Sequence, residues 1–224
     1  MAIPKILHQT WKTHSLPADY QVLQQWLKQL HPTWEYRFYD DAACREVVRQ
    51  QMPSFLPLYD QYPTHIQRID VFRLVTVYIV GGFYLDLDII CHQRLDALCQ
   101  HGAVFAEERT LSAAEAEALE HQDTLRVANY MFGSEARHPF MKQVLREIVI
   151  RSQRPITCEN DVLESTGPGM LTTLYHRVKS QYDDVQLLRN YGQRCLSPYC
   201  QGQSCQFGAY ASHLHVGSWR WQAR

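Results

Sequence analysis

The spacing of apolar residues in the first hundred positions switches repeatedly between the period of a strand and the period of a helix. Residues 34–39 alternate with period two, as a half-buried strand does, whereas residues 19–30 carry apolar side chains three and four positions apart. On this basis strands are expected at residues 3–8, 34–39 and 83–90, and helices at residues 19–30, 41–48 and 64–80. Strands that alternate with helices are typical of layered folds. The pattern predicts an α/β fold with a mostly parallel central sheet flanked by helices.

The second half of the chain is less regular. Helices are expected at residues 113–119, 139–150 and 169–179, strands at 103–106 and 185–188, and a loop or short hairpin over 190–212. No stretch rich in Pro, Gly or Ser and no run of charge divides the chain. We therefore expect a single domain over residues 1–224.

Charge and hydropathy argue against two kinds of partner. Lys and Arg number 22 against 23 Asp and Glu, so no basic surface marks a nucleic-acid binder. The first residues lack the apolar stretch of a signal peptide, and no segment approaches the roughly 18 apolar residues of a membrane-spanning helix. We therefore expect a cytoplasmic chain that does not bind nucleic acid.

The seven cysteines are expected to be reduced and structurally ordinary, as cytosolic thiols usually are. Three of them, Cys195, Cys200 and Cys205, lie five positions apart. A structural zinc knuckle instead uses pairs separated by two residues. The spacing therefore does not predict zinc.

Two carboxylates follow an apolar strand at Asp86 and Asp88. In an extended strand, alternation would place them with Tyr84 on one face, roughly 6 to 7 Å apart. Such a pair repels itself when buried, and a hard divalent cation with oxygen ligands, Mn²⁺ or Mg²⁺, removes that cost. In open α/β sheets ligands bind at the carboxyl ends of strands, where this pair lies. The alternative is a solvated strand end.

The expected helix at 64–80 carries Asp70 and Arg73, three positions apart and therefore on one face. By themselves they would form an ordinary surface ion pair. This helix, however, is expected to end at Gly81-Gly82, directly before the strand with the two carboxylates. An arginine at that place could neutralise a departing diphosphate beside a metal ion.

Two histidines near the end of the sequence are candidate metal ligands. In an extended segment His213 and His215 would point to the same side. Imidazole is a suitable third ligand for Mn²⁺ beside two carboxylates. The sequence does not distinguish between the two histidines.

The blocks Arg68–Arg73 and Gly81–Asp88, which carry the order Asp-Arg, Gly-Gly and Asp-x-Asp, resemble the sugar-binding region of DXD-type glycosyltransferases. That family includes the fungal Golgi initiating α-1,6-mannosyltransferase and many bacterial capsule and lipopolysaccharide transferases. Further similar segments are Ile3–Trp11, Asn129, His138-Pro139-Phe140, Thr166-Gly167-Pro168, His213 and Gly217-Ser218-Trp219. The likeness spans nearly the whole chain.

The resemblance implies a GT-A-type fold, a nucleotide-sugar donor, a divalent metal and retention of the anomeric configuration. Asp86 would contact the donor ribose and reach the metal, and Asp88 would ligate the metal directly. Asp70 and Arg73 would hold the donor sugar and its phosphate. Residues 1–100 would form the nucleotide-sugar half, and residues 101–224 the acceptor half, whose C-terminal His, Ser and Trp close the metal site.

The resemblance also assigns the remaining donor-binding residues. Trp11 would pack on the nucleobase, and Ser218 and Trp219 would close over the diphosphate. The other residues expected around the donor sugar or the acceptor pocket are Tyr84, Asn129, Thr166 and Gly167. Each of these has an ordinary structural alternative, such as a core aromatic ring, a capping amide or a turn.

No obvious carboxylate is available as a covalent nucleophile, since the placement of Glu107 and Glu108 after the strand at 103–106 is not predicted. We therefore expect a front-face mechanism, with the metal and Arg73 stabilising the leaving phosphate. Family frequency favours a UDP-hexose donor, with GDP-mannose as the alternative. The expected acceptor is a saccharide or a lipid-linked saccharide, and a lipid-linked acceptor would place the chain at the inner membrane surface. Oligomeric state is not predicted.

Two other function classes compete with the transferase. The strand at Phe83–Ile89 also resembles the nucleophile strand of haloacid-dehalogenase-type phosphohydrolases, which use Asp-x-Asp with Mg²⁺. In that class the motif lies near the N-terminus and is followed by Thr or Val, whereas here Ile89 follows. A non-catalytic nucleotide-sugar-binding module is the third candidate, although both carboxylates and Arg73 are intact.

Overall fold

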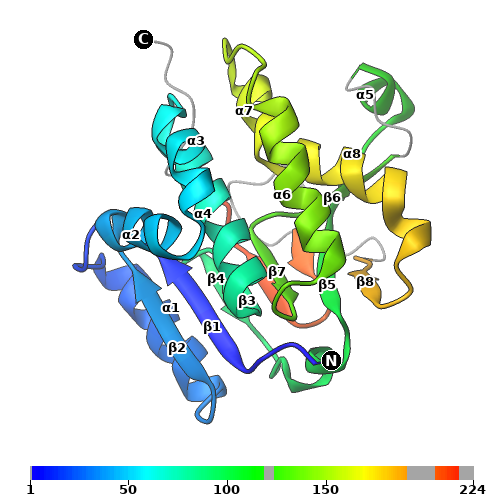
Figure 1. Cartoon of the computed structure of the whole chain (residues 1–224). Helices are drawn as coiled ribbons and strands as arrows, with labels where there is room; N and C mark the ends of the chain where they lie inside the picture. The colour runs from blue at the N-terminus through cyan, green and yellow to red at the C-terminus, as the bar shows by residue number, and fades with distance from the viewer. Residues whose placement is uncertain (1, 119–123, 191–204, 217–224) are drawn as a thin grey trace.

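The computed structural model describes residues 2–118, 124–190 and 205–216. A seven-stranded sheet forms the centre of this part of the chain, with the spatial order β2-β1-β3-β7-β5-β6 and with β8 paired to β5 (Figure 1). Its strands are β1 (Ile6–Thr10), β2 (Glu35–Tyr39), β3 (Gly82–Leu85), β5 (Ala103–Thr110), β6 (Leu125–Val127), β7 (Met131–Ser134) and β8 (Val185–Leu188). Strands β1, β2, β3, β5 and β8 share one direction, while β6 and β7 run in the opposite direction. The mostly parallel sheet is thus confirmed.

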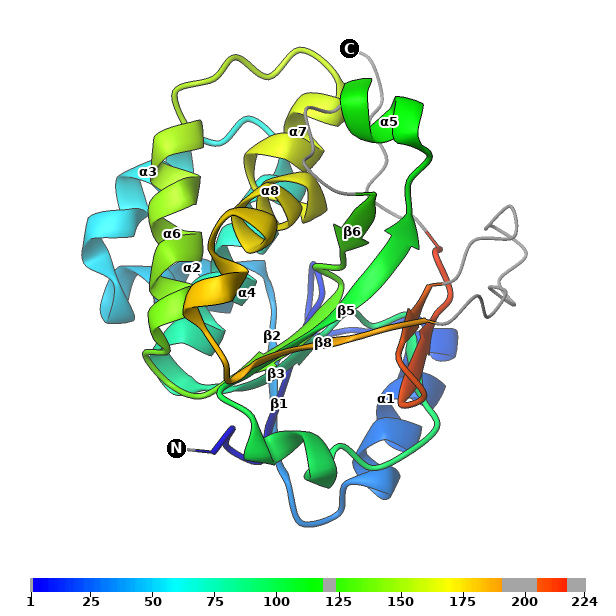
Figure 2. The ribbon, with the colours of Figure 1, turned by 90° about the vertical axis from the view of Figure 1, so that its right-hand side faces the viewer.

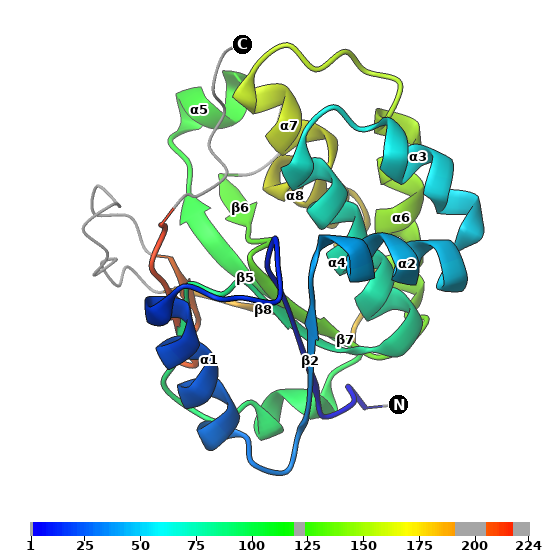
Figure 3. The same ribbon diagram turned by 90° about the vertical axis from the view of Figure 1, so that its left-hand side faces the viewer.

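Most helices cover one face of this sheet, as Figures 2 and 3 show from opposite sides. They are α2 (Asp41–Gln51), α3 (Leu56–Gln61), α4 (His65–Val80), α6 (Pro139–Arg151), α7 (Glu159–Ser165) and α8 (Pro168–Val178). The other face is covered by α1 (Ala18–Leu30) and by a small sheet of β4 (Ile89–Cys91), β9 (Gln206–Phe207) and β10 (Ala211–His213). The remaining elements are α5 (Ala113–Ala118) and the 3₁₀ turns η1 (Pro53–Phe55), η2 (Asp96–Gln100) and η3 (Lys179–Gln181).

Strand alternation divides the core into two clusters of buried side chains, one on each face of the sheet. On β3, Tyr84 belongs to the cluster under α4 and α6, whereas Phe83 and Leu85 belong to the cluster under α1. On β7, Phe132 and Met131 divide in the same way. Both faces of these central strands are therefore buried, which explains their continuous apolar sequence.

The helix that precedes β3 is itself buried on most of its surface. Thr64 caps its N-terminus by accepting a hydrogen bond from the backbone N–H of Gln67, at 3.4 Å. Gly81 ends it with a φ of 75°, and its N–H donates to the carbonyl of Val77 at 2.8 Å. The expected helix at 64–80 is confirmed, and it leads directly into β3.

The expectation of one strand from residue 83 to 90 is wrong. Strand β3 ends at Leu85, and Asp86-Leu87-Asp88 forms a turn in which the Ile89 N–H donates to the Asp86 carbonyl at 3.3 Å. After this turn β4 pairs with β10 and leaves the central sheet. The two aspartates therefore do not share a strand face, although the turn still brings both to one cavity.

Several short elements were not expected from the sequence, namely α3, α7, β6 and β7. The strand expected at 103–106 is longer and continues to Thr110. Of the expected hairpin in 190–212, β9 and β10 are present, while 191–204 lie outside the described residues. No helix among the described residues is long and apolar enough to cross a membrane. Within the same ranges Cys44, Cys91, Cys99, Cys158 and Cys205 are free thiols, and Cys195 and Cys200 lie outside them.

Candidate active site

A cavity of about 830 Å³ opens where strands β1 and β3 end. Thr10 and Trp11 follow β1 into it, and the turn at Asp86–Asp88 follows β3. Helix α4, the loop between β6 and β7, helix α7 and the β9–β10 hairpin also line it, together with residues of α1, α2, β5, α5 and β6. The volume suits a small-molecule ligand, and the place is the carboxyl edge of parallel strands, as the sequence predicted.

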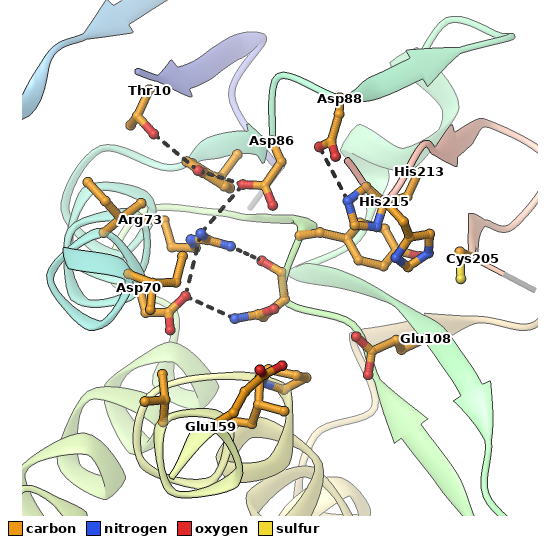
Figure 4. A pocket seen from close by; sticks show the side chains of 18 of the residues that line it. Thr10, Asp70, Arg73, Asp86, Asp88, Glu108, Glu159, Cys205, His213 and His215 are labelled. Atoms are coloured by element: carbon orange, nitrogen blue, oxygen red, sulfur yellow. Dashed lines mark hydrogen bonds and ion pairs between the residues drawn. The ribbon is translucent and has the colours of Figure 1, made fainter. Parts of the chain in front are cut away.

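Three potential metal ligands meet at this cavity. Asp86, Asp88 and His213 each offer one ligand atom, and these atoms lie within 4.8 Å of one another. Figure 4 shows the Asp88 carboxylate facing the ring of His213, with Asp88 Oδ1 and His213 Nε2 3.3 Å apart. Two carboxylates and one imidazole form a donor set that suits Mn²⁺ and is compatible with Mg²⁺. The residues therefore fit the expected divalent cation.

The two aspartates are held in different ways. The backbone N–H of Asp86 donates to the Tyr130 carbonyl at 2.9 Å, and the Asp86 carboxylate accepts from the Tyr84 hydroxyl at 2.8 Å. Asp88 Oδ2 accepts from the backbone N–H of Val216 at 3.0 Å. Burial raises the pKa of Asp86 even though Arg73 opposes it. For Asp88 burial acts in the same direction, but the hydrogen bonds from His213 and Val216 outweigh it and lower its pKa.

His215 lies next to His213 but outside the set of three ligand atoms. The ring centroids of the two histidines are 4.0 Å apart, and both side chains line the cavity. His215 has a φ of 53°, so the chain is not extended there. Both rings thus face the cavity, although the segment that carries them is not the extended one that was expected. The geometry favours His213 as the ligand.

Asp70 and Arg73 are not a surface ion pair, because each is only 3% exposed. Arg73 Nη1 donates to the carbonyl of Asn129 at 2.8 Å, while Nη2 lies 3.4 Å from Asp70 and 3.5 Å from Asp86 (Figure 4). The guanidinium also lies over the ring of Tyr84, 4.6 Å from its centroid. Both ion pairs are longer than a tight charge-assisted bond of about 2.7–2.9 Å, so this cation can also bind a further anion.

The Asp70 carboxylate is held by two residues from distant parts of the chain. Thr166 Oγ1 donates to it at 2.8 Å and Asn129 Nδ2 at 3.1 Å. Burial raises the pKa of Asp70 to about 6, against the opposing effect of Arg73. Asn129 lines the cavity, whereas Thr166 is fully buried and reaches the site only through Asp70. Gly167 precedes α8 as its N-terminal cap residue.

An aromatic wall lies near the end of β1. The rings of Trp11 and Tyr20 are 4.9 Å apart between centroids, and both residues line the cavity. Lys12 Nζ lies 5.7 Å from the centroid of the Trp11 ring. Trp11 thus lies on the wall of the cavity, and its packing on a nucleobase stays a prediction. Ser218 and Trp219 lie outside the described residues.

Several cavity residues were not predicted from the sequence. They are Lys12, Glu108, Arg126, Tyr130 and Glu159. Glu108 pairs with Arg126 at 2.7 Å across β5 and β6, whereas Glu107 bonds to Thr110, Arg189 and Asn190 instead. Successive residues of a strand face opposite sides, so strand alternation could have indicated that only one of the two glutamates faces the cavity.

The chain is similar in sequence to a described protein family and to fungal proteins. Residues 17–105 match the family described as glycosyltransferase sugar-binding region containing DXD motif. Inositol phosphoceramide mannosyltransferase 2 of Schizosaccharomyces pombe is 32% identical over 83% of this chain and 52% of its own length. Inositol phosphoceramide mannosyltransferase 3 of the same yeast is 36% identical over 78% of this chain and 45% of its own length. The chain thus spans about half the length of these relatives.

Among solved structures, the PaToxG glycosyltransferase is similar to this chain with a TM-score of 0.55. The match covers 80% of this chain and 71% of that chain, at 19% sequence identity. Such a likeness concerns the fold. It confirms the GT-A-type architecture that the resemblance implied.

Proposed function

From the match of residues 17–105 to the glycosyltransferase sugar-binding region containing DXD motif, we propose that the chain is a metal-dependent retaining hexosyltransferase. It transfers a hexose from a nucleotide sugar to a saccharide or a lipid-linked saccharide. Its relatives are glycosyltransferases, and the activity, substrates and partners of the whole protein are part of this proposal.

The observation that carries the proposal is that a candidate metal site and a buried arginine line the same cavity. Asp86, Asp88 and His213 form the candidate metal site, and Arg73 lies 3.5 Å from Asp86. A nucleotide sugar presents its diphosphate as a doubly charged group next to the bond that breaks. A metal and an arginine on neighbouring sides of that group would both stabilise the charge that develops on it.

The residues of the chain divide the work. Trp11 and Tyr20 offer ring faces on which a nucleobase can stack. When bound, a divalent cation supplies Lewis-acid stabilisation of the leaving diphosphate, held by Asp86, Asp88 and His213. Arg73 neutralises the same phosphate, and Asp70, fixed by Thr166 and Asn129, orients the donor sugar. The departing phosphate oxygen accepts the proton of the acceptor hydroxyl on the same face of the sugar, which retains the configuration.

The names of the relatives favour mannose as the transferred hexose and an inositol-phosphate lipid as the acceptor class. GDP-mannose is therefore the donor to compare first with a UDP-hexose. A lipid-linked acceptor would bring the chain to a membrane surface as a peripheral protein. Within the single domain, residues 1–100 serve the donor, and residues 101–224 serve the acceptor and close the metal site.

The proposal is tested by thermal unfolding of the purified chain with UDP, GDP and CMP, each with and without Mn²⁺. A ligand at about a hundred times its dissociation constant adds roughly 2.7 kcal/mol, which is a shift of several degrees. We expect one nucleotide to stabilise only with metal, and Asp88→Ala to abolish the effect. Asp60→Ala is the matched control, because Asp60 on α3 forms an exposed pair with Arg45 on α2, outside the cavity.

Other outcomes would identify the competing functions. Stabilisation by Mg²⁺ with a phosphate mimic, but by no nucleotide, would indicate a phosphohydrolase. Metal-dependent nucleotide binding without turnover of any donor would indicate a binding module. Nuclear magnetic resonance of the product sugar then reads its anomeric configuration, and inversion would contradict the front-face mechanism.

A further inference from the structure

Tyr130 touches both sides of the candidate metal site, although neither the motif nor the family resemblance marks it. It follows Asn129 in the loop between β6 and β7, lines the cavity, and is 3% exposed. Its carbonyl accepts the backbone N–H of Asp86 at 2.9 Å. Its ring stacks on His213, with centroids 4.3 Å apart and planes inclined by 29°. A single residue therefore contacts the backbone of one candidate ligand and the side chain of another.

Among the described residues, no group orients the His213 ring through the hydrogen bond that a metal-bound histidine usually makes. Such a ring normally donates its second N–H to a carboxylate, a carbonyl or a water molecule. Here Nε2 faces Asp88 at 3.3 Å, and the buried Nδ1 has no hydrogen-bond partner among the described residues. Rotation of the imidazole about its own bonds is instead limited by the flat ring packed against it. The Tyr130 ring stacks on the imidazole and so does what the missing hydrogen bond would do, which is to hold the plane of the histidine ring.

The preceding residue makes the corresponding contacts on the other side of the cavity. The Asn129 carbonyl accepts from Arg73 at 2.8 Å, and its amide donates to Asp70 at 3.1 Å. Two consecutive residues of one loop thus connect the charge pair on α4, the carboxylate turn after β3 and the histidine of β10. A displacement of this loop would move all three together.

We propose that Tyr130 is a positioning residue of the metal site, whose carbonyl fixes the Asp86 turn and whose ring fixes the plane of the His213 imidazole. The inference rests on the metal site of the proposed function and adds a residue to it. The packing surface of the ring is what matters in this role. Replacing the ring should therefore weaken metal binding, and removing only the hydroxyl should not.

The test is calorimetric titration of Mn²⁺ into the full chain, without nucleotide or acceptor. Tyr130→Phe keeps the ring and should bind Mn²⁺ within about twofold of the wild type. Tyr130→Leu removes the ring and should weaken Mn²⁺ about tenfold or more, the range found when outer groups that orient metal ligands are removed. If Tyr130→Leu does not fold, Tyr130→Met makes the same comparison, because it also lacks a flat ring.

A double-mutant cycle separates positioning from a general loss of stability. In a His213→Ala background, Tyr130→Leu should weaken Mn²⁺ little further, since the ring that it positions is gone. Phe140→Leu is the matched control, because Phe140 is a buried aromatic residue of α6 that does not line the cavity. It should lower the unfolding temperature and leave the Mn²⁺ dissociation constant unchanged.

The possible results distinguish this inference from the function on which it rests. If Tyr130→Leu binds Mn²⁺ as tightly as the wild type, or if its effect adds fully to that of His213→Ala, the positioning role is wrong and the metal site stands. If the wild type binds no Mn²⁺, while Asp88→Ala behaves identically, the metal site itself is wrong and the role of Tyr130 is wrong with it.

Discussion

At the scale of single residues, Arg73 shows how a buried charge is kept available for a ligand. Its guanidinium is 3% exposed, and one nitrogen donates to a backbone carbonyl at 2.8 Å. The contacts of Nη2 with Asp70 and Asp86, at 3.4 and 3.5 Å, are long for ion pairs. The backbone bond fixes the position of the side chain, and the loose ion pairs leave its charge incompletely neutralised.

We expect Arg73→Lys to preserve the fold and to slow sugar transfer by about 10²–10³-fold, the range for loss of one charge-stabilising donor. Lysine carries the charge but cannot bond the Asn129 carbonyl and face both carboxylates at once. The measurement is the turnover of the nucleotide sugar identified by thermal stabilisation. Arg37→Lys, in the partly exposed pair with Glu35, serves as the control and should be nearly silent. Equal turnover in the two variants would contradict the role of Arg73.

Some residues of the candidate site could be predicted from sequence spacing, some only from resemblance to a family, and one not at all. Asp70, Arg73, Asp86 and Asp88 followed from short-range spacing in one segment, because α4 leads directly into β3. Asn129 and Thr166, which bind Asp70 from remote positions, were indicated only by resemblance to a family. Tyr130 was not predicted, because its contribution is a backbone carbonyl and a stacked ring, and neither leaves a pattern in the sequence.

At the scale of elements, the passage from α4 to β3 sets the position of the carboxylate turn. Gly81 and Gly82 have φ values of 75° and 98°, in the region that side chains disfavour. A Cβ on Gly82 would lie 2.6 Å from the carbonyl oxygen of Ile6, on the neighbouring strand β1. The tight turn therefore lets β3 begin directly beside β1, only four residues before Asp86.

We expect Gly82→Ala to lower the free energy of unfolding by about 2 to 4 kcal/mol, from the disfavoured backbone conformation and the close contact together. Urea unfolding of the purified variant measures this loss. Gly102→Ala is the comparison, because Gly102 has no positive φ and its added methyl would meet the side-chain ends of Asp184 and His138 rather than backbone. Losses of equal size in the two variants would show that the Gly82 conformation is not strained by a side chain.

The elements themselves divide into those with local signals and those without. Helices α1, α2, α4, α5, α6 and α8 were predicted because apolar spacing or a run of helix-forming residues lies within each of them. Strand β7 has four residues and follows β6 in the chain, yet it lies between β3 and β5 in the sheet. Such a position depends on tertiary pairing. The turn at Asp86–Asp88 was missed because apolar alternation continues through it into β4.

At the scale of the whole molecule, a buried histidine makes stability depend on pH. His8 lies fully buried on β1, where Nε2 contacts the Gly81 carbonyl at 2.9 Å and Nδ1 contacts the Tyr39 hydroxyl at 3.2 Å. The carbonyl requires a proton on Nε2, so the neutral ring accepts from Tyr39 at Nδ1. Burial lowers the pKa of His8 from 6.5 to about 4, because a charged ring would lose its hydration.

The sign of the pH effect follows from this lowered pKa. The contribution of His8 to stability is complete above pH 6.5, where the ring is neutral in both the folded and unfolded chains. It is lost as the pH falls from 6.5 towards about 4, because only the unfolded chain then binds the proton. The difference in pKa corresponds to about 3 kcal/mol in total.

Unfolding free energies measured by urea titration between pH 7 and pH 4.5 should fall more steeply for the wild type than for His8→Gln. Parallel slopes for the wild type and His8→Gln would refute the assignment.

The late position of His213 has a consequence for protein synthesis. Asp70, Arg73 and Asp86 lie close together in the sequence. His213, which pairs with Asp88, follows more than a hundred positions later, on β10. Because translation proceeds from the N-terminus, a polypeptide interrupted before β9 would contain the donor-side charges but an incomplete set of metal ligands. We therefore expect products that end before β9 to show none of the proposed transferase activity, because they lack the third candidate metal ligand.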